Sequence, residues 1–314
     1  MQIKIIENSK KFLGLSAVLV ILSLVIIFTK GLNYGIDFSG GNLIQIKYEK
    51  PVQLSSLNEV LDEAAENIPQ LSGNSRKVQI SEGTTVIIRT QELNENQKNE
   101  VLQDLSKLGT YEINKIEKVG ASVGKELKSS AIYSLLIGAA LIVVYITIRF
   151  EFVFSIGAII ALTHDLIIAV GVISLLNYEV DTPFIAAVLT ILGYSINDTI
   201  VVFDRIRENL RRKSKKKIDF VQCLDNSINQ VMIRSINTSV TTLFAIIAIL
   251  IFGGDSLRTF IVTLLVGMLA GTYSSVFIAT PIVYLLDKNN KNNSGLENII
   301  NKEETKKSKD KILV

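Results

Sequence analysis

The sequence contains one cysteine and one histidine among its 314 residues. A single thiol, Cys223, excludes a disulfide framework and a metal site built on paired thiols. The sequence also lacks a His-Glu-x-x-His motif and any other cluster with metal-ligand spacing. These absences argue against hydrolase and redox chemistry. We therefore expect a protein that is not an enzyme and that holds no metal ion.

A nucleotide-binding loop is lacking as well. The phosphate-binding pattern G-x-x-x-x-G-K-[ST] has two partial matches, GIDFSGG at 35–41 and GASVGK at 120–125. The first has glycine in place of the lysine, and the second is one residue too short and is followed by Glu126. We expect no nucleotide cofactor, so any work that the protein performs must draw on an ion gradient.

Charged residues are nearly absent from six long stretches, although they make up 20% of the chain. A membrane-spanning helix needs about 20 apolar residues, and one such stretch, but not six, fits inside a soluble core. The sequence therefore predicts a polytopic α-helical membrane protein with six transmembrane helices. The stretches are residues 12–28, 129–148, 152–176, 182–203, 235–254 and 259–286.

Positive charge distinguishes the two sides of the membrane. Residues 204–217 hold eight Arg and Lys against two acids, whereas the loops 177–181 and 253–258 hold one basic residue between them. Basic loops stay in the cytoplasm, so we expect the N-terminus, the loop 204–234 and the C-terminus there. The first stretch is too long for a secretory signal, and residues 1–30 are predicted to form an uncleaved anchor.

Residues 31–128 are then expected to form one domain outside the cytoplasm. A capping box at Ser56 and Glu59 predicts the start of its first helix. The pattern of apolar residues gives the order β-α-β-β-α-β, which is ferredoxin-like. The predicted strands are 42–48, 78–81, 85–90 and 111–119, and the predicted helices are 56–68 and 94–108.

The cytoplasmic segments carry most of the remaining charge. The loop 204–234 is basic at first and then amphipathic, which fits a helix on the inner membrane face or an ordinary solvated helix. Residues 129–286 include the five remaining spans. The tail 287–314 is rich in Asn, Lys and Glu and is predicted to be disordered.

Asp198 is the one charged residue within the stretch 182–203. A central Asp costs about 2.5 to 3.5 kcal/mol in a membrane span, so its presence needs a compensating cause. Ser195 lies on the same helical face, and Asn197 and Thr199 flank it. The pattern predicts a polar sector that faces other helices rather than lipid.

The next stretch begins beside Arg234 and continues with Asn237, Thr238, Thr241 and Thr242, whose offsets place them on one helical face. We expect Arg234 to pair with Asp198, because the two lie at similar depth on antiparallel helices. A static ion pair that fixes helix packing is one interpretation. The other is a proton-binding carboxyl group gated by the guanidinium, with the threonines conducting protons.

Two further polar or small-residue groups lie in the spans. His164 and Asp165 are adjacent near the middle of the third stretch, where they form either a proton relay or a structural contact. Gly267, Gly271 and Ser275 lie four residues apart, which indicates close helix packing rather than chemistry.

Several motifs, taken in their order along the chain, resemble the SecF family, the smaller membrane subunit of the bacterial SecDF complex. The resemblance covers the whole chain. The motifs are GIDFSGG at 35–41 (with Gly35, Asp37, Phe38, Gly40 and Gly41), ALTHDLI at 161–167, GYSINDTIVVFDRIREN at 193–209, RSINTSVTT at 234–242 and GTYSSVFIATP at 271–281.

The resemblance implies one six-helix half of an RND-superfamily membrane protein, paired with SecD in the bacterial plasma (inner) membrane. It implies assistance to SecYEG and SecA in late steps of preprotein export, with protons as the coupling ion. Asp198 would carry the proton, and Arg234 and Thr238 would gate it. Unfolded preprotein and membrane lipids are the further partners expected, and nucleic acid is not.

On this hypothesis, protonation of Asp198 alters its pairing with Arg234, and the outer domain then moves against an emerging polypeptide. The glycines of 35–41 and 120–124 would serve as hinges. The alternative is half of an RND-type small-molecule or lipid exporter, which should have a larger outer domain with an apolar pocket. A scaffold that only stabilises a partner is the third class.

Overall fold

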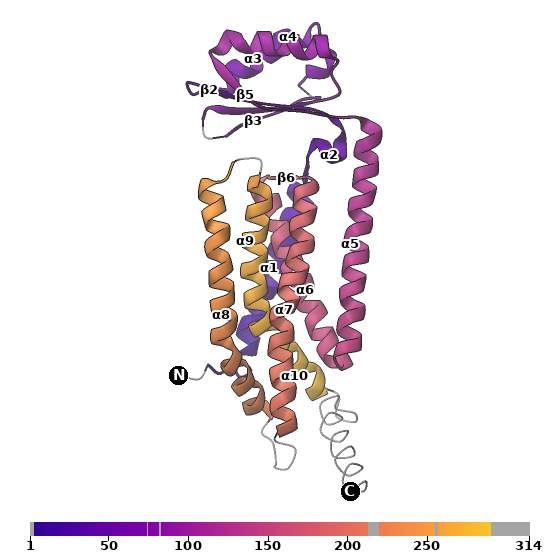
Figure 1. The fold of residues 1–314 in the computed structure, drawn as a ribbon, viewed down its shortest axis with the longest axis vertical. Helices are drawn as coiled ribbons and strands as arrows, with labels where there is room; N and C mark the ends of the chain where they lie inside the picture. The colour runs from indigo at the N-terminus through magenta and orange to yellow at the C-terminus, as the bar shows by residue number, and fades with distance from the viewer. Residues whose placement is uncertain (1–2, 74, 82, 213–219, 255–256, 290–314) are drawn as a thin grey trace. The chain divides into compact units, whose positions relative to one another are not determined.

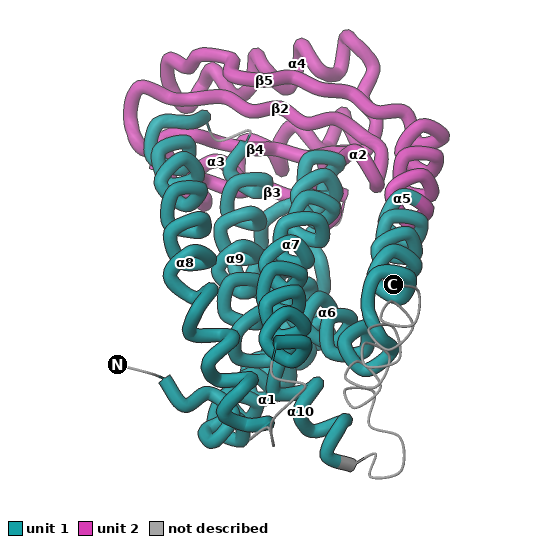
Figure 2. The backbone as a smooth tube through the Cα atoms, turned by 60° about the horizontal axis from the view of Figure 1, so that its bottom comes forward, with its two compact units in different colours: residues 1–33, 134–314 teal, residues 34–133 magenta. Residues whose placement is uncertain are grey.

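The computed structural model describes residues 3–73, 75–81, 83–212, 220–254 and 257–289. The chain divides into two compact units (Figure 2). Unit 1 comprises Met1–Asn33 and Ser134–Val314, and unit 2 comprises Tyr34–Tyr133.

Unit 1 is helical, and the described residues include six helices that are long and apolar enough to cross a membrane, as predicted. The sixth of these is continuous from α9 to α10 through a short π-helical segment, η4 (Figure 1). The elements are α1 (Ser9–Lys30), α5 (Ala121–Arg149, whose first part belongs to unit 2), α6 (Phe152–Leu176), α7 (Thr182–Arg212), α8 (Phe220–Phe252), α9 (Arg258–Ser274), η4 (Ser275–Ala279) and α10 (Thr280–Asn289).

The turn between α6 and α7 has clear local causes. Asn177 ends α6 in the left-handed conformation at φ 56°, which asparagine tolerates better than most residues. The Asp181 side chain accepts a hydrogen bond of 2.9 Å from the backbone N–H of Phe184, in the first turn of α7. These two ends make α6 and α7 an antiparallel pair.

The helices differ strongly in how much of them is enclosed. Half of the most apolar window of α7 and 67% of that of the α9–α10 helix are buried, against 6% for α5. Large apolar side chains of α5, such as Leu141 and Ile148, are mostly exposed. The interior of the bundle is therefore built by α6, α7 and α9, and α5 presents surface suited to lipid.

The loop predicted at 204–234 differs from the prediction. Its amphipathic part is neither a surface helix nor a solvated one, because it forms the first turns of α8. Cys223, Leu224 and Ile228 are buried in one apolar cluster with Ile206 and Leu210 of α7. Its apolar face thus packs on the end of the preceding helix rather than on lipid. Residues 213–219 of the basic part lie outside the described residues.

The N-terminal segment is attached to this same part of α8. The backbone N–H groups of Ile5 and Ile6 donate to one carboxylate oxygen of Asp225, at 3.0 and 2.9 Å. Asn229 exchanges two hydrogen bonds with the backbone of Ile3. At the other end, α10 includes residues 287–289, so the expectation of disorder from 287 is wrong there, and 290–314 lie outside the described residues.

Unit 2 has the predicted element order β-α-β-β-α-β. Its four main strands form one antiparallel sheet in the order β3-β4-β2-β5, and Figure 1 shows α3 and α4 on the same side of it. The elements are β2 (Gly41–Tyr48), α3 (Leu54–Ala65), β3 (Lys77–Ser81), β4 (Thr85–Thr90), α4 (Glu95–Leu105) and β5 (Tyr111–Val119), with the short α2 (Ile36–Ser39), η1 (Pro69–Leu71), η2 (Ser106–Leu108), β1 (Asn33–Tyr34) and, in unit 1, β6 (Glu179–Val180).

The core of unit 2 lies between the sheet and the two helices. Alternate residues of the central strands, such as Ile44, Ile46 and Ile88, are fully buried against Leu57 and Leu105 of the helices. This follows from the two-residue period of a strand.

Two tyrosines at one edge of this core bond to α4. The hydroxyls of Tyr48 and Tyr111 donate to the backbone carbonyls of Leu105 and Leu102 at 2.8 and 2.7 Å. Burial raises the pKa of both tyrosines, so both remain hydrogen-bond donors in ordinary conditions.

One predicted helix start in unit 2 is wrong. The helix α3 begins at Leu54, before the proposed box at Ser56 and Glu59, and its N-cap Gln53 makes no side-chain cap. The capping box instead lies at Asn94 and Gln97, where each side chain accepts from the backbone N–H of the other at the start of α4. An amide pair satisfies the same orphan donors as the expected hydroxyl and carboxylate.

Candidate functional site: buried acids between α6, α7, α8 and α9

Asp198 of α7 is 4% exposed and lies within the bundle. The hydroxyl of Ser239 on α8 is its hydrogen-bonding neighbour, and Ser239 in turn pairs with Thr272 of α9 at 2.7 Å. The Oδ2 atom of Asp198 has no hydrogen-bond partner among the described residues. A charged Asp in a span costs about 2.5 to 3.5 kcal/mol, so binding or losing a proton here changes the energy of the bundle substantially.

Asp165 of α6 forms a second buried acidic centre. It is fully buried and meets three side chains from three helices. One oxygen accepts from the hydroxyls of Ser195 on α7 and Ser274 on α9, at 2.6 and 2.8 Å. The other oxygen lies 2.9 Å from Nδ1 of the adjacent His164. This carboxyl group therefore joins α6, α7 and α9.

The two centres are connected through α7. Ser195, which donates to Asp165, lies three residues before Asp198, and both are buried as the sequence predicts. Thr199 is also buried, and its hydroxyl donates to the Ser195 carbonyl at 3.2 Å. Asn197 is exposed and does not belong to this sector.

Arg234 does not meet Asp198. Arg234 is exposed, and no ion pair joins the two side chains, both of which lie in the described part of the chain. Thr238 and Thr241 are exposed as well, and Thr242 is partly buried. The predicted contact is therefore wrong for the chain taken alone.

The two side chains do not meet because the face of α8 that points inward is one residue further along the helix than predicted. Its inward-facing residues are Ser235 and Ser239, each one position beyond Arg234 and Thr238. One residue turns a helix by about 100°, so the Arg234 face points away from α7 although the depth agrees. The depths are similar, because Asp198 lies about 24 Å from the start of α7 at Thr182 and Arg234 lies about 27 Å from the end of α8 at Phe252. The threonine hydroxyls of this face donate to carbonyls of α8 itself.

The small-residue stripe of α9 lies against α7. A Cβ atom at Gly267 would lie 2.2 to 2.8 Å from three side-chain atoms of Ile191, and one at Gly271 would lie 3.0 Å from Cβ of Ser195. Ser275 is fully buried, and its hydroxyl donates to the Thr272 carbonyl. The glycines allow α9 to approach α7 closely.

We predict that Gly267→Ala weakens the packing of α7 on α9 by about 1 to 3 kcal/mol, because overpacking forces the enclosed Ile191 to move. Thermal unfolding of the purified protein in detergent measures this as a lower midpoint. Gly193→Ala is the control, since nothing lies within 4 Å of a Cβ there. Adding Ile191→Val, which removes the atom in closest contact, should restore part of the loss. An unchanged midpoint for Gly267→Ala would contradict the packing.

The glycine motif at 35–41 lies in unit 2. Gly35 precedes α2, which contains Asp37 and the buried Phe38. Gly40 and Gly41 follow at φ 71° and 117°. A Cβ at Gly40 would lie 2.9 Å from the Cα of Ala121, and one at Gly41 would lie 2.1 Å from the carbonyl oxygen of Thr90.

The second glycine segment packs on the first. A Cβ at Gly124 would lie 3.0 Å from the backbone nitrogen of Gly40. These glycines therefore serve close approach between backbones. That role differs from the hinge expected of them, because a hinge needs room to turn.

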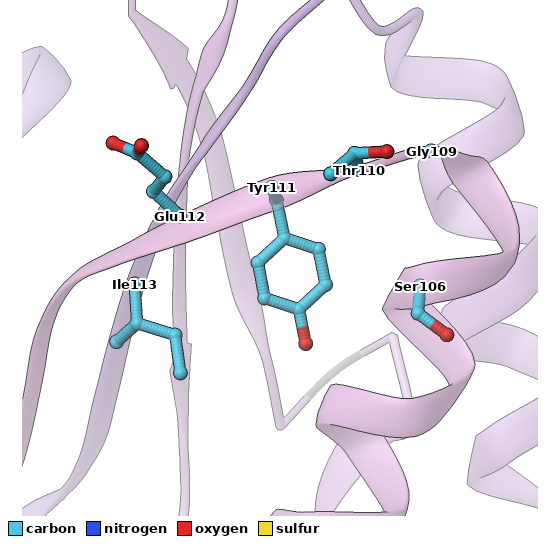
Figure 3. Close-up of a pocket in the computed structure, with 6 residues that line it drawn as sticks. All are labelled: Ser106, Gly109, Thr110, Tyr111, Glu112 and Ile113. Carbon is cyan, nitrogen blue, oxygen red and sulfur yellow. The ribbon is translucent and has the colours of Figure 1, made fainter.

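A surface hollow of about 810 Å³ lies at the start of β5 (Figure 3). The hollow is open, and its lining is both polar and apolar, whereas an exporter is expected to have an apolar pocket. The lining residues are Ser106, Gly109, Thr110, Tyr111, Glu112 and Ile113.

Among the described residues, no three His, Cys, Asp or Glu side chains gather as metal ligands would.

Sequence reasoning missed Ser239, Thr272 and Ser274. The polar positions Ser235 and Ser239 lie four apart in an apolar stretch, which was a usable signal for a second face of α8. Ser274 lies inside the motif GTYSSVFIATP, but nothing local distinguishes its role from that of Ser275.

The described residues contain six apolar helices and two buried carboxyl groups between α6, α7, α8 and α9, which together define a multi-pass membrane protein with acids inside its bundle. Comparison with known proteins narrows this class. Residues 97–289 match the family described as "Protein export membrane protein SecD/SecF, C-terminal", and residues 25–52 match the "SecD/SecF GG Motif". The chain belongs to the SecD/SecF family, on its SecF branch.

Three relatives illustrate the similarity. Protein translocase subunit SecF of Sebaldella termitidis is 48% identical over 310 residues, which cover 96% of this chain and 100% of that protein. That of Calditerrivibrio nitroreducens is 41% identical, with 90% and 94% covered. The crystal structure of SecDF, a translocon-associated membrane protein from Thermus thermophilus, has a TM-score of 0.84 and 32% identity. The match covers 92% of this chain and 39% of that SecDF chain.

Proposed function

We propose that this chain is the SecF-type subunit of an accessory complex of the protein translocase. In the bacterial inner membrane it uses the proton-motive force to promote late steps of preprotein export. The observation that carries the proton-driven part is Asp198, a buried carboxyl group with one oxygen that has no partner among the described residues. Kinship with SecF subunits supports the translocase part.

The energy available is sufficient for this role. One proton crossing 100 mV supplies about 2.3 kcal/mol, and each unit of pH difference adds about 1.4 kcal/mol. The cost of a charge at Asp198 is of the same size, about 2.5 to 3.5 kcal/mol. One proton bound and released at this group can therefore shift a helix packing equilibrium, and unit 2 would pass the movement on to the polypeptide.

A partner of SecD type would cover the polar face of α8. Arg234, Asn237, Thr238 and Thr241 are exposed on one face of α8. An arginine within a span rarely faces lipid and usually meets protein or water. The SecDF chain of the Thermus relative contains this chain's length and considerably more, which supports a second half against α8. Gating of Asp198 by Arg234 in that complex would require α8 to turn by about 100°, which corresponds to one residue.

A cross-linking experiment tests the covered face. With Cys223, the one cysteine of the chain, replaced by alanine, Thr241→Cys is expected to cross-link to the partner chain in native membranes. The control Leu141→Cys, on the mostly exposed face of α5, is expected to give no such product. Equal cross-linking at both positions, or none at Thr241, would rule out a partner on this face of α8.

The orientation and the outer domain belong to the same proposal. The excess of Arg and Lys at 204–217 supports cytoplasmic termini and an extracytoplasmic unit 2. The element order and the strand order β3-β4-β2-β5 support a ferredoxin-like domain there. SecYEG with SecA and an unfolded preprotein are the partners that this arrangement would serve.

The proposed function is tested by in-vitro translocation of a trapped preprotein into membrane vesicles. Vesicles that contain the chain and its partner are expected to complete translocation faster when a proton gradient is present, and vesicles without the chain are not. A pure scaffold would help equally with and without the gradient. An exporter half would leave preprotein translocation unchanged in both conditions.

A further inference from the structure

His164 has one ring nitrogen without a partner. It is 5% exposed, and its Nε2 is buried with no hydrogen-bond partner among the described residues. Its Nδ1 lies 2.9 Å from the Asp165 carboxylate. Buried polar atoms of this kind are rare unless they take part in a reaction or bind water or an ion. A histidine that served only as a packing contact would not need an unused bonding position on its ring.

The hydrogen bonds around Asp165 suit an ionised carboxylate. Its two oxygens receive the hydroxyls of Ser195 and Ser274 and the Nδ1 atom of His164. With Asp165 as a carboxylate, its oxygens accept all three bonds, and Nδ1 then carries the hydrogen that points to Asp165. In the neutral imidazole the other nitrogen, Nε2, is then bare and is the acceptor.

We propose that His164 and Asp165 form a second proton-binding site, distinct from Asp198, in which Nε2 of His164 takes up the proton. The proton forms a bond to the Nε2 lone pair, while the Nδ1–H bond to Asp165 is kept. The product is an imidazolium next to a carboxylate, so the new charge is paired where it forms. Protonation of an isolated buried imidazole would instead create an unpaired charge, which is far costlier.

The other ionisable groups near His164 and Asp165 are found on the elements that pack on α6. The elements that pack on α6 are α1, α7, α9, η4 and α10. On α7 the ionisable groups are Tyr194 and Asp198 within the apolar span, and the charged residues of its last turns, Asp204, Arg205, Arg207, Glu208, Arg211 and Arg212. On α9, Tyr273 stacks on the imidazole at 6.2 Å between ring centroids, and its hydroxyl donates to the Phe12 carbonyl of α1. The remaining ionisable groups lie near the ends of α1, α9 and α10, at Lys10, Lys11, Lys30, Arg258, Tyr284, Asp287 and Lys288.

The geometry gives the second site a way to affect the first. Ser195 donates to Asp165 and lies one helical turn from Asp198 on the buried face of α7. When His164 gains charge, Asp165 is held more strongly by it, and its bond to Ser195 changes in strength. The site would thereby adjust α7 next to Asp198. Its role in export rests on the proposed function, whereas the existence of the site does not.

The chain's one histidine makes the direct test unambiguous, since nitrogen-15 labelled histidine reports on residue 164 alone. We expect solid-state NMR of the full-length protein in lipid bilayers to show one protonated and one bare ring nitrogen at alkaline pH. On acidification both nitrogens should become protonated. An Nε2 signal that stays in one state across the whole pH range in which the protein remains folded would overturn the proposal, with no variant needed.

Two variants assign the cause. In Asp165→Asn the balancing anion is removed, so the imidazole is expected to remain neutral under conditions that protonate it in the parent. Thr163→Ala is the matched control, because Thr163 is exposed on the same helix and bonds only to its own helix. If Asp165→Asn protonates as the parent does, the pair is not the site. The parent titration still decides the matter if Asp165→Asn fails to fold.

A translocation assay distinguishes failure of this proposal from failure of the proposed function. In the translocation assay, His164→Gln is expected to flatten the pH dependence of gradient stimulation. A pH profile identical to the parent's would remove the role of the site in export. A normal titration in the NMR experiment combined with no gradient stimulation in the parent would retain the site and reject the proposed function.

Discussion

Asp198→Asn is expected to insert and fold normally and to lose all gradient-dependent stimulation of preprotein translocation. Asparagine has nearly the same shape and is neutral, so the cost of a charge in the bundle disappears. It has no site for a transferable proton, however, and the gradient can no longer act through it. A proton crossing 100 mV supplies about 2.3 kcal/mol, which corresponds to about 50-fold in an equilibrium. The variant is therefore expected to lose a large gradient-dependent stimulation of translocation.

The measurement compares completion of a trapped preprotein with and without a proton gradient, in vesicles that contain equal amounts of parent or variant protein. Asp204→Asn is the matched control on the same helix. Asp204 is 43% exposed and pairs with Arg149 at 3.1 Å, and an exposed pair contributes only about 0 to 1 kcal/mol. Stimulation that persists undiminished in Asp198→Asn would show that another group carries the proton.

Gly41→Ala is expected to destabilise unit 2 strongly. The residue adopts φ 117°, and the new Cβ would lie 2.1 Å from the carbonyl oxygen of Thr90. That atom is backbone in a strand paired with β2, so it cannot rotate away. Backbone strain costs about 1 to 3 kcal/mol and overpacking a further 1 to 3 kcal/mol. The free energy of unfolding of a whole domain is only about 5 to 15 kcal/mol.

Hydrogen exchange of the full-length protein measures this effect, as faster exchange of the β2, β4 and β5 amides with the helices of unit 1 unaffected. Gly120→Ala is the control, because nothing lies within 4 Å of a Cβ there and its φ is not positive. Equal protection of the sheet in Gly41→Ala and in the parent would mean that the chain can shift Thr90 at little cost.

Local patterns predicted the elements well because their causes are local. The strands 85–90 and 111–119 coincide with β4 and β5, since two-residue alternation next to glycine turns marks both ends. The six spans were found because an uncharged apolar stretch of about 20 residues is typical of a membrane helix. Their ends were less well predicted. The helix α8 starts at Phe220 rather than near 235, because its polar first turns continue the same helix.

The candidate site was predicted in part. The burial of Asp198, Ser195, His164 and Asp165 follows from the cost of polar groups in lipid, which sends them to the interior. The partner assigned to Asp198 was wrong, because Arg234 and Ser235 differ by one residue and both faces of α8 contain polar groups. Composition alone offered no reason to prefer the serine face.

The sequence by itself determined that this chain has six helices long and apolar enough to cross a membrane, that acids lie inside these helices, and that a β-α-β-β-α-β unit follows the first of them. These depend on hydrophobicity and periodicity, which act over one element at a time. Only the tertiary structure decided that Ser195, Ser274 and His164 converge on Asp165, and that Arg234 faces outward. The rotation of each helix depends on the close contacts of its neighbours, such as Gly267 on Ile191, and these contacts join residues that are far apart in the chain.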